Sequence, residues 1–385
     1  MAEHRQPKTI LWIAAGNQEN ESLVSLFSRL VKQLPWECRN ILMTNALNWD
    51  NFKGEVYKVN ITDDLSLVTR YRQVVLAAYH EGILEQADII ITGGMTATLL
   101  SYVLSVEYST NLRERPIVYI SPKVPEKSVT EFSVEGKEER LFWWLVGNMS
   151  NIHAIVLDND REYELASERL FESAPYTGKS IERLILWKYN GATEVPGKKD
   201  KVVWSGRLNP IKRPDIGARI FSLLRGRDVE VEFFFPAVAP SRRRFLSALK
   251  QDFQVYLNLE TTEYRREAGS AKVLLITSEV EGQPLGYLEL LEMDVIPVIR
   301  KRPWMKTFLT EKWPLVFTSE GESVEMCIDV MQNYTKYVDL LHDCLGERYN
   351  KEPNFAQLIE QIWSDYVAGD YRHDYSVANR GRKVR

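Results

Sequence analysis

The sequence contains few of the residues that form disulfide scaffolds or soft-metal sites. Its 385 residues include three cysteines and five histidines. Cys38, Cys327 and Cys344 lie far apart without metal-ligand spacing, and the histidines form no cluster. A disulfide framework or a cysteine and histidine metal site is therefore not expected. We expect a reduced protein of the cytoplasm, or of the host cytoplasm if the protein is viral.

Long apolar runs are also missing from the sequence. No run approaches the roughly 18 residues of a membrane span. The first residues, MAEHRQPKTILWIAAG, have no apolar signal core that ends in a small-residue cleavage site. We expect neither a transmembrane segment nor a secretory signal.

Familiar nucleotide-binding motifs are absent or incomplete. No G-x-G-x-x-G occurs, which argues against a nicotinamide or flavin enzyme. SAPYTGKS ends like a phosphate-binding loop, but Ser173 replaces the first glycine that the loop requires. Asp158 and Asp160 form a D-x-D that could hold a divalent metal, although helix capping by one of them is the alternative. We expect no metal site.

Charge of one sign does not dominate the chain. The formal net charge is −4, which argues against a general nucleic-acid coat protein. Basic residues nevertheless cluster at Arg242–Arg244, in RKRPWMK from Arg300 and in the final RGRKVR. These clusters are either solvated surface or a local patch for an anionic partner.

The order of apolar segments indicates an α/β protein. The length suggests two domains, and a hydrophobic content of 44% with 26% charged residues is globular. Continuous apolar runs alternate with helical stretches on both sides of a linker around Tyr189–Lys201, which indicates parallel sheets buried on both faces. We predict two Rossmann-like, doubly wound domains that face a cleft. The predicted segments are residues 1–190, residues 198–350, and residues 351–385 as a helix that packs back on the first domain with a basic tail.

Two cations follow the first strand of the second domain. In VVWSGRLNPIKRPD, the strand ends at Gly206, and Arg207 and Lys212 precede a helix that Pro214 opens. Ligands of such sheets bind beyond the carboxyl ends of the strands. Arg as a planar fork and Lys as a point charge would suit a diphosphate there.

A later strand of the same domain is followed by two acids. In SEVEGQPLGYLELLEMDVIPVI, Glu281 and Gly282 make a turn before a helix near Pro284. Gly286 would let a ligand approach the backbone, and the helix N-terminus offers N–H groups to phosphate. Glu289 lies beside the face expected to pack on the sheet, where a carboxylate needs partners such as sugar or ribose hydroxyls.

Together these loops resemble the retaining, nucleotide-sugar-dependent glycosyltransferases of the GT-B fold. That family typically carries G-R-L-x-x-x-K, here Gly206 to Lys212, and two glutamates separated by seven residues, followed by P-V-I. Here these are Glu281-Gly282-Gln283-Pro284-Leu285-Gly286-Tyr287-Leu288-Glu289 and Pro297-Val298-Ile299. The close match spans Val202 to Ile299. Gln283-Pro284 replaces the usual Phe-Gly, and Pro284, which has no N–H, cannot make one backbone contact that the family makes to its donor.

The resemblance implies a glycosyltransferase, hexosyl or pentosyl, with roles for these residues. Arg207 and Lys212 would neutralise the diphosphate leaving group, Glu281 would bind donor-sugar hydroxyls, and Glu289 would bind the ribose. No cofactor is implied beyond a UDP or GDP sugar donor, and no metal is needed if the two cations balance the diphosphate. The residues implied to bind the donor are Gly16, Gly206, Gly282, Leu285, Gly286 and Glu289.

The acceptor is less well defined by the sequence. YLELLEMDVIPVI is also similar to a segment of phage enzymes that glycosylate hydroxymethylated pyrimidines in DNA, and the basic clusters would suit DNA. Sugar, lipid-linked and small-molecule acceptors are the other candidates. A nucleotide-sugar epimerase and a binding protein without turnover are the alternative functions.

Overall fold

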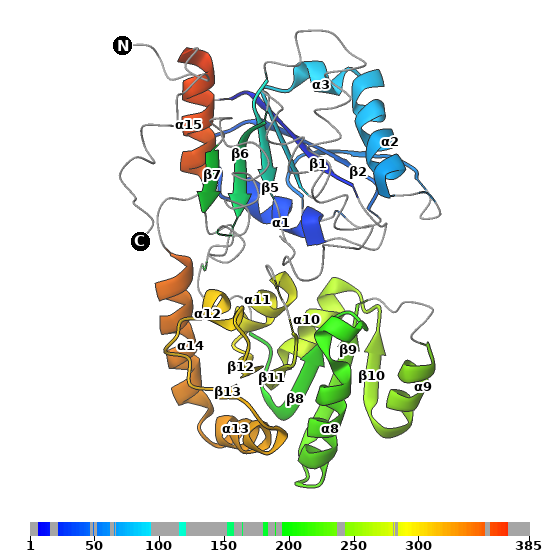
Figure 1. The fold of residues 1–385 in the computed structure, drawn as a ribbon, viewed down its shortest axis with the longest axis vertical. Coiled ribbons are helices and arrows are strands. Elements are labelled where there is room, and N and C mark those ends of the chain that lie inside the picture. The colour runs from blue at the N-terminus through cyan, green and yellow to red at the C-terminus, as the bar shows by residue number, and fades with distance from the viewer. Residues whose placement is uncertain are drawn as a thin grey trace. The chain divides into compact units, whose positions relative to one another are not determined.

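The computed structural model describes parts of both predicted halves of the chain (Figure 1). Contacts divide the chain into two compact units, Met1–Trp187 with Glu352–Arg385, and Lys188–Lys351. Within the described parts, no helix is long and apolar enough to cross a membrane. The described residues are 7–15, 22–46, 49, 52–61, 65, 67–93, 115–120, 152–157, 164, 180–183, 189, 195–236, 243–279, 281, 284–350 and 355–368.

The first unit contains a seven-stranded parallel sheet in the order β3-β2-β1-β4-β5-β6-β7. Every residue of its central strands β1 and β4 is buried, so both faces of these strands are covered. The strands are β1 (Thr9–Ala14), β2 (Arg39–Thr44), β3 (Glu55–Lys58), β4 (Ile89–Gly93), β5 (Ile117–Ile120), β6 (Ile152–Leu157) and β7 (Ser180–Arg183). The described helices are α1 (Ser22–Val31), α2 (Leu67–His80), α3 (Ile83–Gln86) and α15 (Phe355–Ala368).

One detail of the first unit differs from the sequence-based expectation. The sequence predicts one helix from Leu65 to Leu84, whereas α2 ends at His80 and α3 follows. Gly82 lies between them with φ +64°, a left-handed conformation that interrupts the helix and suits glycine. The last helix of the chain, α15, belongs to this unit, and the Phe355 ring lies 6.1 Å from that of Trp12.

The second unit contains a six-stranded parallel sheet in the order β10-β9-β8-β11-β12-β13. In both units the order reverses beside the first strand, which defines doubly wound Rossmann-like sheets and confirms the predicted fold class. The strands are β8 (Lys199–Ser205), β9 (Glu230–Phe235), β10 (Gln254–Leu257), β11 (Ala271–Ile276), β12 (Ile296–Arg300) and β13 (Val316–Phe317). The helices are η2 (Pro210–Lys212, a 3₁₀ turn), α8 (Pro214–Arg225), α9 (Arg243–Asp252), α10 (Thr261–Gly269), α11 (Leu285–Leu291), α12 (Met305–Phe308), α13 (Glu320–Gln332) and α14 (Tyr334–Tyr349).

Tight packing around Trp204 fixes the end of β8 relative to α8. The Trp204 ring lies 5.6 Å from Phe233 and 5.3 Å from Phe235, and it is almost fully buried. A Cβ added to Gly217 of α8 would lie only 2.8 Å from the Trp204 ring. The absence of a side chain at Gly217 therefore lets α8 approach the strand, and this holds the loop between β8 and α8 close to the sheet.

For the closing segment of this unit, the sequence predicts a long helical stretch from about Ser323 to Leu345. The structure breaks this segment at Asn333, whose φ of −118° and ψ of 33° are not helical. A capping box of Ser319 and Glu322 begins α13, so the helix also starts earlier than expected.

Candidate functional site

The carboxyl ends of β8 and β11 define the candidate site. β8 pairs with β9 on one side and with β11 on the other, so the strand order changes direction here. Such a switch point is where open α/β sheets bind ligands. The loop after β8 carries Gly206, Arg207 and Lys212, and the segment after β11 carries Glu281.

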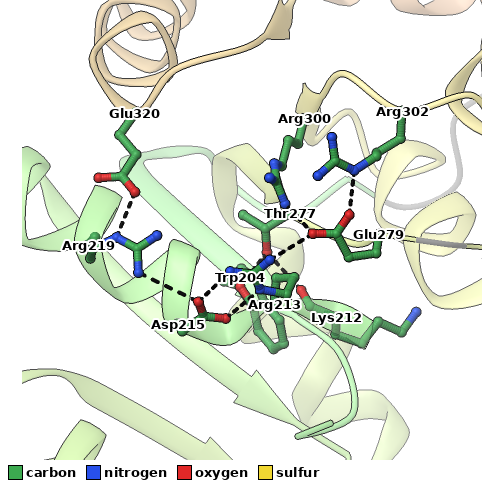
Figure 2. Close-up of polar contacts among 10 residues, drawn as sticks. All are labelled: Trp204, Lys212, Arg213, Asp215, Arg219, Thr277, Glu279, Arg300, Arg302 and Glu320. Carbon is green, nitrogen blue, oxygen red and sulfur yellow. Dashed lines mark hydrogen bonds and ion pairs between the residues drawn. The ribbon is translucent and has the colours of Figure 1, made fainter. Parts of the chain in front are cut away.

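The loop after β8 is held by side chains at three points. The Asn209 side chain accepts a hydrogen bond of 3.0 Å from the Lys212 N–H and caps the 3₁₀ turn. The buried Thr277 hydroxyl lies 2.8 Å from the carbonyl oxygen of Lys212 and 2.9 Å from that of Arg213. The same hydroxyl accepts from Trp204 Nε1 at 2.8 Å. Thr277, the residue that follows β11, therefore fixes the backbone at Lys212, as Figure 2 shows.

Lys212 and Glu281 form an ion pair between the two loops. Their side chains are only 14% and 8% exposed, so most of the pair is withdrawn from water. The Lys212 ammonium also lies 5.0 Å from the centre of the Tyr287 ring. Burial raises the pKa of Tyr287 well above its usual value, and the Glu281 carboxylate raises it further. Two residues predicted from separate motifs thus meet, and Glu281 holds Lys212 in place.

Helix α11 brings the second predicted glutamate to the same edge. Pro284 precedes the helix, and Glu289 is half-buried between buried Leu288 and Leu290. Burial raises the pKa of Tyr264, and the Glu289 carboxylate raises it further. The Tyr264 hydroxyl lies 2.8 Å from that of Ser205, the last residue of β8. These relations place Glu289 near the carboxyl end of β8.

The remaining predicted residues differ in their surroundings. Gly206 donates its N–H to the carbonyl oxygen of Phe234 at 3.1 Å. Arg207 is exposed, and its side chain forms no ion pair within the described part of the chain. Leu285 is buried, whereas Gly286 is exposed, and a Cβ added there would meet no atom within 4 Å. The predicted donor-binding residues Gly16 and Gly282 lie outside the described residues, as do Asp158 and Asp160, where we expected no metal site.

An arginine cluster that the sequence did not predict lies beside this pair. Glu279 accepts hydrogen bonds from Arg213 at 2.8 Å, Arg300 at 2.6 Å and Arg302 at 2.5 Å (Figure 2). Arg213, with a left-handed φ of 52°, also makes a two-pronged contact with Asp215 at 2.9 and 2.8 Å. The arginines, Arg302 first, lower the pKa of Glu279 to about 2.

Part of this cluster was visible in the sequence as the basic stretch that begins at Arg300. Solvated surface was one of two interpretations of that stretch. It describes Arg300 and Arg302 incompletely, because both side chains also bind Glu279 and are only 20% and 28% exposed. Glu279 itself gave no signal, since a single glutamate after a strand is common.

Comparison with known proteins gives structural but not sequence matches. No protein-family model matches the chain, and no curated protein matches it. The fold is similar to sucrose-phosphate synthase from Thermosynechococcus elongatus, with TM-score 0.65 and 10% identity over 96% of this chain and 100% of that one. It is also similar to Anabaena HepE in complex with UDP and glucose, with TM-score 0.60 and 13% identity over 94% and 100% of the two chains.

A third similar structure is a mutant of S. aureus TarM in complex with fondaparinux, α-GlcNAc-glycerol and UDP. It matches with TM-score 0.54 and 13% identity over 77% of this chain, which spans 58% of that protein's chain. These structures are GT-B glycosyltransferases. The chain therefore has the GT-B fold, and its second unit carries both sequence motifs at the expected edge of the sheet.

Proposed function

We propose that the chain is a retaining glycosyltransferase that moves a hexosyl or pentosyl group from a UDP or GDP sugar to a hydroxyl acceptor. The observation that carries this proposal is the Lys212–Glu281 pair at the β8/β11 switch point of a GT-B fold. The similar structures of HepE and TarM contain UDP, which supports a nucleotide donor. All three cysteines are free thiols, which supports a reducing compartment such as the cytoplasm.

Arg207 and Lys212 act on the leaving group in this proposal. Negative charge develops on the nucleoside diphosphate as the glycosidic bond breaks, and cations held in position stabilise that charge most in the transition state. Lys212 is held by its backbone contacts and by Glu281, whereas Arg207 reaches into solvent from an anchored loop. Because these two side chains supply the balancing charge, we propose that transfer needs no metal.

The glutamates and glycines bind the rest of the donor. Glu281 would accept hydrogen bonds from hydroxyls of the transferred sugar while its partner Lys212 binds a phosphate oxygen. Glu289, close to the end of β8, would accept from the ribose hydroxyls. Gly286 leaves open space beside the backbone for the donor, and we assign Gly206 and the buried Leu285 to the donor site from the sequence motifs. We assign Gly16 and Gly282 to the same site from the sequence motifs.

Incubation of the purified chain with UDP and GDP sugars, with and without acceptors, tests the proposal. A retaining transferase gives a product whose anomeric configuration, read by proton NMR, equals that of the donor, and EDTA leaves its rate unchanged. An epimerase converts the nucleotide sugar without acceptor, and a binding protein changes nothing. The double variant Arg207→Ala/Lys212→Ala should abolish transfer, and inversion of configuration would contradict the proposed mechanism.

The acceptor that we propose to test first is a hydroxymethylated pyrimidine in DNA. The similarity of Tyr287–Ile299 to phage DNA-modifying enzymes and the basic clusters of the sequence support this choice. Matched oligonucleotides with and without the hydroxymethyl group, beside free sugars and lipid-linked sugars, give the comparison. Transfer only to the modified oligonucleotide supports a DNA acceptor, and transfer only to sugars excludes it.

A further inference from the structure

The arginine cluster around Glu279 has more hydrogen-bond donors than its acids can satisfy. A guanidinium group has five N–H donors. Within the described residues, Arg300 makes one side-chain hydrogen bond, to Glu279, and Arg302 makes two, to Glu279 and to the carbonyl oxygen of Lys301. The forks of both arginines therefore keep donors for a further acceptor, and their partial exposure makes these donors reachable from solvent.

The cluster also contains more positive than negative charges. Asp215 balances Arg213 through a two-pronged contact, which leaves the single carboxylate of Glu279 to balance Arg300 and Arg302. Both guanidinium groups contact this carboxylate within 2.6 Å, so their positive charges are held close together. A carboxylate or phosphate that bridges them would lower this repulsion, because Arg forks match the geometry of both anions.

The position of the cluster connects it with the candidate site. Glu279 lies two residues before Glu281, and Arg213 follows Lys212 directly. Figure 2 shows Arg300, at the end of β12, and Arg302, just after it, converging on Glu279. We propose that Arg300 and Arg302 form an oxyanion site separate from the Arg207 and Lys212 cations. We assign this site to an acidic group of the substrate other than the donor diphosphate, and that assignment rests on the proposed function. The existence of the anion site does not depend on the proposed function.

Calorimetric titration with inorganic phosphate tests the site without any turnover. The variant Arg300→Gln/Arg302→Gln should raise the dissociation constant for phosphate about tenfold or more, since it removes two charged forks. The matched control is Arg227→Gln/Arg266→Gln, which removes two exposed arginines that pair with acids of α13 and α10 and should leave binding unchanged. Equal phosphate affinity in the native chain and the Arg300/Arg302 variant would overturn the site.

Glu279→Gln separates an anion site from a purely structural cluster. Removing the built-in carboxylate should tighten phosphate binding about tenfold, because a unit charge next to the anion is lost. A structural cluster would instead lose stability and gain no affinity, which would overturn the proposal. Arg302→Lys serves if the double variant does not fold: it keeps the charge but loses the fork, and it should weaken phosphate binding.

Titrating phosphate into the Arg207→Ala/Lys212→Ala variant shows whether the two sites are separate. Phosphate binding should persist there even if transfer is lost, so failure of the proposed function would not hide the anion site. Loss of phosphate binding in this variant would overturn a separate site.

Comparing the binding of UDP-glucuronic acid with that of UDP-glucose then shows which substrate supplies the anion. A preference for the acid that depends on Arg300 and Arg302 assigns the oxyanion to the donor, and equal binding assigns it to the acceptor.

Discussion

Replacing Lys212 by alanine should lower both turnover and stability, whereas replacing Arg207 should lower turnover alone. Both changes remove a cation expected to act on the leaving group, so each should reduce turnover by on the order of 100-fold. Their effects on folding differ because Arg207 is exposed, whereas Lys212 pairs with Glu281 in a site where the two side chains are 14% and 8% exposed.

The expected loss of unfolding free energy follows from the burial of this ion pair. Without Lys212, the Glu281 carboxylate stays withdrawn from water without its partner, which costs about 1–3 kcal/mol of unfolding free energy. This is less than the roughly 3–5 kcal/mol for a fully buried pair, because some solvent still reaches Lys212. Arg207→Ala should change the unfolding free energy by less than about 0.5 kcal/mol, as exposed substitutions usually do.

Urea unfolding measures the coupling between Lys212 and Glu281. The variants compared are Lys212→Ala, Arg207→Ala, Glu281→Gln and the double variant Lys212→Ala/Glu281→Gln. The double variant should be more stable than the sum of the single effects predicts, by about 1–2 kcal/mol, because it leaves no unpaired charge. Additive effects, or a Lys212→Ala variant as stable as Arg207→Ala, would refute the claim that this pair is coupled and withdrawn from water.

Four further predictions concern single residues. Gly286→Ala should fold as well as the native chain or gain up to about 1 kcal/mol and should weaken binding of UDP, seen by calorimetry. Gly321→Ala, at the equivalent position of α13, should affect folding similarly but leave binding unchanged. Thr277→Val should lower the unfolding free energy by about 1–3 kcal/mol and reduce turnover, since its hydroxyl holds the loop that carries Lys212; intact activity would contradict this. Glu289→Gln should weaken UDP and the intact donor alike, whereas equal affinities in variant and native chain would remove the ribose role. The pKa of Glu279 is lowered to about 2 from 4.5, so its stabilisation is present above pH 4.5 and is lost as pH falls toward 2. Urea midpoints between pH 5 and 3 should therefore fall more steeply for the native chain than for Glu279→Gln.

The order of strands and helices could be predicted wherever a segment is apolar and buried on both faces. Strands β1 and β4 are mostly apolar, β8 and β11 contain the apolar runs VVW and VLLI, and the sequence predicts a strand at each of these places. The edge strand β3 is short and partly exposed, and its sequence EVYK has no apolar run. The helix α10 is mostly polar, with Tyr264 and Ala268 as its apolar side chains, so it has no clear apolar face to indicate a helix.

The site residues could be predicted where one sequence motif contains both the turn after a strand and the charged residue that the turn presents. Gly206 with Lys212 and Glu281 with Glu289 keep fixed spacings, so their strand-end positions follow from the local sequence. The contacts of Glu279 with Arg300 and Arg302 depend on residues 21 and 23 positions away, at the end of a neighbouring strand and just after it. No local pattern reports which of several charged residues will meet across a sheet, and this contact became visible only in the folded chain.

The central claim is that the chain binds a nucleotide-sugar donor at the Lys212–Glu281 pair. Thermal unfolding with UDP, GDP and ADP tests this claim most directly, because a ligand that binds the native state must stabilise it. The proposed function predicts that UDP or GDP raises the melting temperature of the native chain. The Arg207→Ala/Lys212→Ala variant should show little of that increase. No increase with any nucleoside diphosphate, or the same increase in the variant, would contradict donor binding at the Lys212–Glu281 pair.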